Sequence, residues 1–331
     1  MGLVEQALRL GRRGSSVRPL KLVFGIRAGG YSGLLQRALT DFGAEESFLR
    51  AAQRVKEHYG IEVSASAIRR ISFQHGRVIN GLGEKRCCGP ARELITEMDG
   101  SLIPVVQRGA GVDGRRSKVL AWREVRLCCA RTLAMAEPIY GATLGSVENA
   151  SWLWRQTAQR AGLRDQTYVH GVGDGAGWIV DRFKENFGQQ GDYLLDFFHV
   201  SEYLAAAGKA IKGEKKCSAW LRRQQGRLLK NQWSKVLRSM EAYREPLQSK
   251  EAPVRAAWRY LRERTGHLDF QRARRRNLPI GSGEIESAHR HVIQKRLKLA
   301  GSWWKETNAQ AMINLRTARA NHDWNTYWNA N

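Results

Sequence analysis

Apolar residues fall into short runs in the middle of the chain, and this pattern predicts β-strands. The first run covers residues 94–106 and the second, residues 118–131, alternates apolar and polar positions. Shorter runs follow at residues 140–144, 168–172 and 193–200. We expect these five strands to form a sheet, and we expect a turn to break the first strand near its middle.

Helical spacing separates the later strands. Residues 147–162 place Ala150, Trp154 and Ala158 on one face, and residues 178–187 form a second helical stretch. The order along the chain is three strands, then helix, strand, helix and strand. Three consecutive strands followed by alternation predict an α/β fold with a mixed sheet flanked by helices.

The N-terminal part of the chain has a different pattern. Residues 1–40 are basic and glycine-rich, and we expect a loosely organised arm. Apolar positions at helical spacing then end at Tyr59, Gly60 stops the helix, and Ser64 or Ser66 begins another. Two helices joined by a tight turn predict a helix-turn-helix unit or an ordinary helical hairpin, and the charge of the chain favours the first.

The stretch of residues 205–277 is almost wholly helical in pattern. Its tryptophans, among them Trp220, Trp233 and Trp258, recur with leucines at helical spacing, so we expect them in the core of a helical block. This block interrupts the α/β pattern. A capped helix over residues 282–299 then follows.

The charge of the chain is strongly positive. Lys and Arg number 55 and Asp and Glu number 31, so the formal net charge is +24. Such a charge is costly in a compact chain unless a polyanion neutralises it. Basic runs at residues 115–118, 272–276 and 290–298 together predict a DNA-binding surface, although any one run could be a solvated face. We assign to this surface Arg274, Arg275, Arg276, Arg290, Lys295, Arg296 and Lys298.

Two adjacent tryptophans near the C-terminus have a related interpretation. Trp303 and Trp304 could stack on an unpaired base. Packing against the sheet is the competing role, and we expect it for at least one of them.

Membrane and secretory classes find no support in the sequence. No apolar run approaches the roughly 20 residues that span a bilayer, and the start of the chain lacks the apolar stretch of a signal peptide. The five cysteines have no C-x-x-C spacing, so reduced thiols are preferred to a zinc site or disulfides. We therefore expect a cytoplasmic protein.

Three carboxylates occupy positions where a ligand site is expected. Asp99 lies inside the first apolar strand, where a charge is costly unless it is paired or bound to a metal. Asp174 follows the fourth strand, and Glu286 lies near the start of the last helix. Such a trio can hold two Mg²⁺ or Mn²⁺ ions for phosphoryl transfer. Each acid could equally be a local salt-bridge partner, and the residues alone leave both possibilities open.

Four segments of the chain resemble bacterial insertion-sequence transposases. They are MDGSLIPVV (98–106), GDGAGWI (173–179), LLDFFHV (194–200) and LPIGSGEIESAHRHVIQKRLK (278–298). The family is the Mutator-like group of DDE transposases, which includes the ISKra-type elements. The resemblance covers about residues 93–328. It implies a ribonuclease-H-like fold with a helical insertion before the third acid.

The resemblance also implies roles for particular residues. Asp99, Asp174 and Glu286 look like the three catalytic, metal-binding acids of the family. Glu284 is the alternative third acid, since residues two apart on a helix point about 200° apart and cannot both face the metals.

Two further residues match the family's (Cys/Asp)-x-x-His signature. Asp196 and His199 would orient groups beside the scissile phosphate, or they pair locally and only shape the strand end. The partners implied are double-stranded DNA, as element inverted repeats and as target, and further copies of the chain in a homodimer or larger complex near the nucleoid.

The expected organisation has four parts, with the catalytic core split in two. They are a basic arm with a helix-turn-helix-like DNA-binding region (1–90), the first part of the catalytic core (91–204), the helical insertion (205–277) and the last helices of the core with the third acid (278–331).

Two other functions are compatible with parts of the sequence. Gly171, Gly173 and Ala176 spell G-x-G-x-x-A between a strand and a helix, with Asp196 at the next strand, which outlines an NAD-binding site of an oxidoreductase. Asp174 inside that loop would repel a pyrophosphate. The other alternative is a non-catalytic DNA-binding regulator derived from a transposase. We expect instead a transposase that hydrolyses a phosphodiester at element ends and joins the freed 3′-hydroxyl to target DNA.

Overall fold

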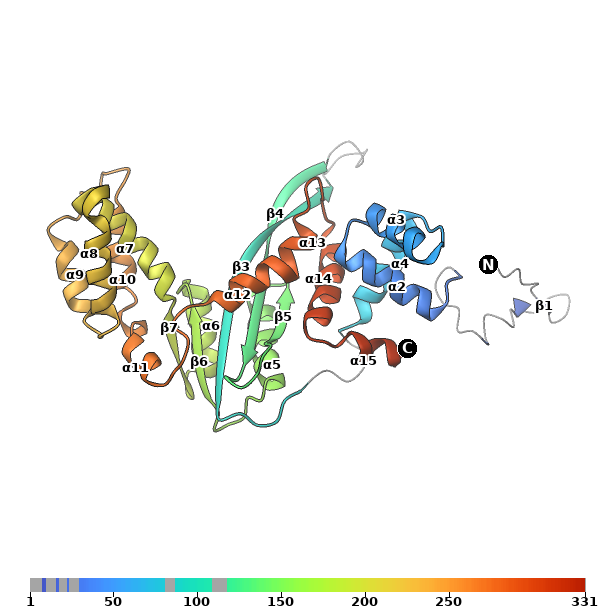
Figure 1. The fold of residues 1–331 in the computed structure, drawn as a ribbon, viewed down its shortest axis with the longest axis horizontal. Coiled ribbons are helices and arrows are strands. Elements are labelled where there is room, and N and C mark those ends of the chain that lie inside the picture. Colours follow the sequence, from blue (N-terminus) through green and yellow to red (C-terminus); the bar gives the residue numbers. More distant parts are fainter. Residues whose placement is uncertain are drawn as a thin grey trace. The chain divides into compact units, whose positions relative to one another are not determined.

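Five β-strands form one mixed sheet in the computed structural model, which describes residues 8–9, 16–17, 23, 30–80, 87–108 and 118–330 (Figure 1). The strands are β3 (Glu93–Arg108), β4 (Lys118–Arg131), β5 (Ile139–Thr143), β6 (Tyr168–Gly173) and β7 (Gly191–Leu195). Their order in the sheet is β5-β4-β3-β6-β7. The β4–β5 pair is antiparallel, whereas β6 is parallel to both β3 and β7. This sheet gives the mixed α/β, ribonuclease-H-like fold that the sequence predicts.

The chain separates into two units. The first contains Met1–Lys85, Ile103–Arg123 and Val292–Asn331, and the second contains Arg86–Leu102 and Glu124–His291. Each of the long strands β3 and β4 therefore contributes residues to both units. The division of the chain into four functional regions stays a prediction.

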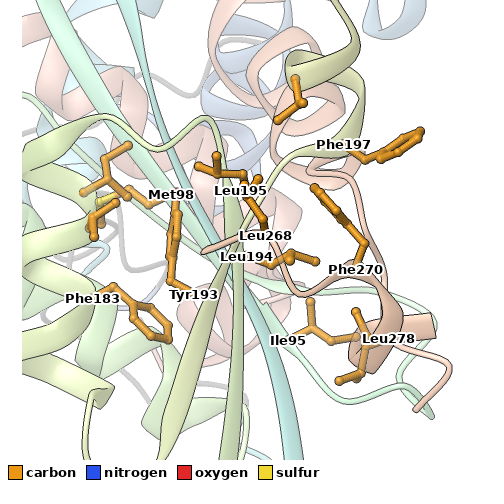
Figure 2. Close-up of a cluster of buried hydrophobic side chains, with 14 of the residues drawn as sticks. Ile95, Met98, Phe183, Tyr193, Leu194, Leu195, Phe197, Leu268, Phe270 and Leu278 are labelled. Carbon is orange, nitrogen blue, oxygen red and sulfur yellow. The ribbon is translucent and has the colours of Figure 1, made fainter. Parts of the chain in front are cut away.

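The second unit is built around the sheet. Helices α5 (Val147–Arg160) and α6 (Gly177–Phe187) meet at Trp154, whose ring contacts those of Phe183 and Phe187 and whose Nε1 donates to Thr96 Oγ1 at 2.5 Å. Both faces of the sheet are covered by apolar side chains (Figure 2).

Alternation along β3 directs its side chains to the two faces. Met98 lies with Phe183 and Tyr193, whereas Ile95 lies with Phe270 and Leu278 on the other side of the strands (Figure 2). The strand runs without the turn that we predicted. Gly100 lies within the continuous strand. A Cβ at this position would meet the side chain of Glu124.

A block of helices follows β7. Its members are α7 (Phe197–Lys212), α8 (Glu214–Leu228), α9 (Trp233–Glu241), α10 (Pro253–Arg262), the 3₁₀ turn Thr265–His267 and α11 (Phe270–Arg275). Trp220 is buried, and Trp233 and Trp258 pack against the core, as the spacing predicts. The predicted strand over residues 193–200 is wrong at its end. The carboxylate of Asp196 caps a helix there, so residues 197–200 form the first turn of α7.

The described part of the first unit is mainly helical, and it also contains parts of the strands β3 and β4. Its helices are α2 (Gly33–Glu45), α3 (Phe48–Tyr59), α4 (Ala65–Val78), α14 (Glu306–Ala320) and α15 (Trp324–Asn329). Gly60 ends α3 in the left-handed region at φ 66°, and Ser64 caps α4, as predicted. Helix α2 begins within residues 1–40, with Ser32 as its N-cap, so the expectation of a loosely organised arm is wrong for residues 33–40. Most of the basic arm, apart from the paired strands β1 (Leu8–Arg9) and β2 (Ser16–Val17), lies outside the described residues.

The predicted helix over residues 282–299 contains three consecutive segments. They are α12 (Gly283–Ala288), a π-helix (His289–Gln294) and α13 (Lys295–Leu297). A π-helical turn changes the angular relation between residues before and after it. Glu286 on α12 and Arg290 on the π-helix are therefore not related by regular α-helical spacing. In the described part of the chain, no helix is long and apolar enough to cross a membrane.

Candidate active site

Asp99 lies on β3, the central strand of the sheet, and its side chain is 38% exposed. The N–H of Gly100 donates to its Oδ1 at 2.7 Å, and Nε2 of the buried His289 lies 3.5 Å from its Oδ2. The pKa of Asp99 is raised to about 6, chiefly by burial and in smaller part by the negative charges of Asp174 and Glu286. The structure thus brings Asp174 and Glu286 into electrostatic range of Asp99.

The other two acids come from separate elements. Asp174 follows β6, and its Oδ1 accepts the N–H of Ala176 at 2.9 Å, while its carbonyl accepts the hydroxyl of Tyr260 at 2.5 Å. Glu286 is exposed on the first turn of α12. Among the described residues, no three His, Cys, Asp or Glu side chains are close enough to form a metal site as they stand. The charges of Asp174 and Glu286 act on Asp99, but the three side chains do not form a metal-binding cluster as they stand.

The alternative third acid, Glu284, faces a different set of groups. Its Oε1 accepts Arg131 Nε at 2.5 Å. Beside it lies Glu97, which is buried and accepts the N–H of Ile285 at 2.9 Å. Burial raises the pKa of Glu97 to about 8, with Glu284 and Asp196 adding to the effect. Glu286, and not Glu284, is among the main charges that act on Asp99.

Glu97 and His289 are site residues that we did not assign from the sequence. Glu97 lies two positions before Asp99 in the same apolar run, so the cost of a charge there was a usable signal. His289 lies three residues after Glu286, but nothing in that spacing places it against Asp99 rather than in the DNA-binding surface.

Asp196 connects two segments that carry the site. Its Oδ1 accepts the N–H groups of Phe198 and His199 at 2.6 and 3.0 Å, at the start of α7. Its Oδ2 accepts the N–H and hydroxyl of Ser282 at 2.6 and 2.5 Å, just before α12. The hydroxyl of Ser282 therefore does not cap α12, although the sequence predicts a capped helix. Asp196 holds in place the helix that bears Glu286.

His199 extends this arrangement toward Asp174. Its Nδ1 lies 3.5 Å from Glu202 Oε2, and its ring packs edge-on against those of Tyr203 and Tyr260. Tyr260 in turn donates to the Asp174 carbonyl. Asp196 and His199 thus contact neighbouring protein groups, and their role beside the scissile phosphate stays a prediction.

A cavity of about 470 Å³ opens beside Glu286. Phe198 lines it with a side chain that is 64% exposed, together with Asp196 and Arg131. The cavity gives a ligand access to the acid on α12.

The exposed basic residues of this unit include part of the predicted DNA-binding surface. Arg274 and Arg275 are exposed at the end of α11, and Arg290 is exposed on the π-helix. Arg276 is engaged within the protein, because it donates to Glu93 at 2.5 Å and its guanidinium lies 3.9 Å from the ring centroid of Tyr168.

The basic run that follows is only partly exposed. Lys298 is exposed, and Lys295 pairs with Glu45 at 3.2 Å. Arg296 is only 2% exposed, so the prediction that it belongs to an exposed DNA-binding surface is wrong. Its guanidinium packs on the rings of Phe48 and Trp304 instead, which the spacing of basic residues could not indicate. Residues 115 and 116 of the remaining basic run lie outside the described residues.

The glycines of the G-x-G-x-x-A sequence have a packing role. A Cβ at Gly171 would meet the ring of Phe183 at 2.4 Å, and one at Gly173 would meet the hydroxyl of Tyr193 at 2.4 Å. Asp196, which would have to bind a ribose, is buried with both oxygens bonded to protein. This geometry does not favour an NAD site.

Comparison with known proteins gives limited similarity. No family model matches the chain. A Streptococcus gallolyticus protein described as the UPF0236 protein in the vanSb 3′ region is 27% identical over 168 residues, which are 50% of this chain and 36% of that protein. The chain therefore spans about a third of the length of this curated relative. A chain of the Drosophila P element transposase strand transfer complex superimposes on this chain with a TM-score of 0.33 and 9% sequence identity. The match covers 92% of this chain and 82% of that chain. A TM-score this low assigns neither fold nor function. The fold is described by its own mixed sheet, with the strand order β5-β4-β3-β6-β7.

Proposed function

We propose that this protein is a DNA transposase of the DDE type, in which Asp99, Asp174 and Glu286 are the catalytic acids. The observation that carries the proposal is the placement of the acids: Asp99 lies on the central strand β3, Asp174 directly follows the neighbouring strand β6, and Glu286 lines a cavity from α12. The charges of Asp174 and Glu286 contribute, after burial, to the raised pKa of Asp99. Like charges gathered at a ligand-accessible edge are typical of a functional site rather than of salt bridges. The similarity of four sequence segments to Mutator-like transposases supports it further.

Divalent metal ions suit this set of side chains. Three carboxylates supply hard oxygen donors and an uncompensated negative charge, which are the properties that bind Mg²⁺ or Mn²⁺. When bound, two such ions supply a clamp on the attacking and leaving oxygens of a phosphoryl transfer. Asp99 and Glu286 would hold them, with Asp174 as the third ligand. The Gly100 N–H and His289 orient Asp99, and Asp196 fixes the helix of Glu286.

Double-stranded DNA is the substrate that fits the chain, as the inverted repeats of an element and as its target. The net charge of +24 supplies attraction to phosphates, and Arg274, Arg275, Arg290 and Lys298 are exposed cations that can contact them. Action on two element ends requires a homodimer or larger complex, which would act at the nucleoid.

Cleavage of DNA that carries the repeats flanking the coding region tests the proposal. With Mg²⁺, the protein should nick this DNA, and Asp99→Asn should lose at least about 100-fold in rate, as expected when transition-state charge stabilisation is removed. Asp181→Asn, which changes an exposed acid on α6, serves as the matched control and should retain activity. Equal cleavage by Asp99→Asn and the wild type would reject the catalytic assignment. DNA binding with no cleavage by any form would favour the non-catalytic regulator.

A further inference from the structure

A groove of about 1240 Å³ lies in the first unit, and none of the three acids lines it. Its walls come from the starts of α3 and α4, from the exposed face of α4, from Val106 and Lys118 on the long strands, and from residues 301–308. Nothing in the proposed catalytic mechanism uses this groove.

The charges that line the groove have a single sign. Among the described residues that line it, none is an Asp or Glu, although the chain contains 31 of them. Its exposed cations are Arg69, Arg70, Arg77, Lys118 and Lys305. Three of these lie along one side of α4, and a concave surface with one sign of charge concentrates ligands of the opposite sign.

One further cation lines the groove from a buried position. Arg296 is 2% exposed, its Nε donates to the carbonyl of Gly43 at 3.0 Å, and its Nη2 has no hydrogen-bond partner among the described residues. The nearest carboxylate, Glu45, is already bonded by Arg316 and Lys295. A buried guanidinium with unused donors is costly, and an anion in the groove would satisfy it.

An aromatic side chain stands beside these cations. Trp304 is fixed by backbone hydrogen bonds to β3 and by donation of its Nε1 to the Leu297 carbonyl at 3.0 Å. Its neighbour Trp303 is therefore held on an ordered backbone, yet its side chain is 51% exposed in the lining of the groove. Trp304 is therefore packed within the protein, as expected from the sequence for at least one of the two, and the exposed ring of Trp303 can contact a ligand.

We propose that this groove binds a single-stranded segment of DNA, with backbone phosphates at Arg69, Arg70 and Arg296 and an unpaired base stacked on Trp303. Two features favour a single strand over a duplex. A buried guanidinium is reached by a flexible strand that enters the groove and not by the convex surface of a duplex, and indole stacking requires a base that is not already stacked in a helix. The inference deepens the proposed function, because it assumes that DNA is the substrate.

Fluorescence anisotropy with a labelled single-stranded oligonucleotide, in EDTA, tests the groove in the full chain. Trp303→Ala should bind about 5- to 150-fold more weakly, the range expected when one base–aromatic stack is removed. Arg69→Ala/Arg70→Ala should bind more weakly and should lower the slope of log affinity against log salt by about 1.4, or about 0.7 for each phosphate of a single strand that is no longer neutralised. The controls are Trp152→Ala, which removes an exposed indole from α5, and Arg222→Ala/Arg223→Ala, which removes two exposed cations from α8.

The controls should bind the single strand as the wild type does. The proposal is overturned if Trp303→Ala binds it like Trp152→Ala, or if the Arg69/Arg70 variant weakens duplex binding more than single-strand binding. Binding in EDTA does not depend on cleavage. Loss of cleavage in every form would therefore remove the transposase proposal while leaving the groove intact, and failure of the groove variants would leave cleavage by Asp99-dependent chemistry untouched.

Discussion

Glu97 shows how strongly a single buried carboxyl group can couple the fold to pH. Its pKa is raised to about 8, chiefly by burial, whereas an unfolded glutamate titrates near 4.3. The folded protein therefore holds a proton that the unfolded chain releases. Stability is fully present below the unfolded pKa and is lost as the pH rises through the folded value. The buried carboxyl group of Glu97 accepts the N–H of Ile285 at the start of α12.

We expect Glu97→Gln to remove this pH dependence, since the amide oxygen can still accept the Ile285 N–H. Relative to the wild type, the variant should gain stability as the pH rises from about 4 to about 9, by up to about 5 kcal/mol at about 1.4 kcal/mol for each unit of pKa shift. Urea denaturation in EDTA across this range measures the gain. Glu57→Gln, at an exposed position on α3, is the control, and a gain of equal size there would contradict the role of burial.

At the scale of elements, Asp196 joins α7 to α12 through Ser282. Ser282→Ala removes one donor from a buried carboxylate, so the free energy of unfolding should fall by about 1–3 kcal/mol, as for hydrogen bonds to charged groups. Cleavage should fall as well, because α12 carries Glu286. Ser287→Ala, exposed on the same helix, should change stability by less than about 0.5 kcal/mol. Equal stability of the two variants in urea would show that this connection does not hold α12.

The elements also show what could be predicted from local sequence. Gly60 and Ser64 fix helix ends by local geometry, and the apolar runs of β3 to β7 fix the strands of the sheet, so both were predicted. The start of α7 was missed although its signal is local, because the apolar residues 197–200 were assigned to the strand and Asp196 was not recognised as the N-cap of a helix. The burial of Arg296 was missed because it depends on tertiary packing against the rings of Phe48 and Trp304.

The candidate site divides in the same way. Asp99 was singled out because a charge inside an apolar strand needs a partner, and the catalytic roles of Asp99, Asp174 and Glu286 were predicted from the resemblance to the transposase family. The preference for Glu286 over Glu284 depends on Arg131, which engages Glu284 from β4. No spacing within residues 281–298 contains that information.

For the molecule as a whole, a net charge of +24 predicts affinity for duplex DNA that falls steeply with salt. The slope counts the phosphates that exposed cations neutralise, so burial and internal pairing decide which arginines contribute. All three of Arg274, Arg275 and Arg276 are exposed, but Arg276 is paired with Glu93 and lies over Tyr168. These three adjacent residues should therefore differ in their effect on DNA binding, although the sequence analysis assigned all three to one DNA-binding surface.

We expect Arg274→Ala/Arg275→Ala to lower the slope of log affinity against log salt for duplex DNA by up to about 1.8, or about 0.9 for each phosphate that is no longer neutralised. Arg276→Ala should leave the slope close to that of the wild type and should instead lower the melting temperature, because it removes the ion pair with Glu93 and the stacking on Tyr168. Anisotropy with a labelled duplex at a series of salt concentrations gives the slopes, and thermal denaturation gives the stabilities. If Arg276→Ala lowered the slope as much per residue as the double variant, all three arginines would contact DNA, and the internal pairing of Arg276 would have to open when DNA binds.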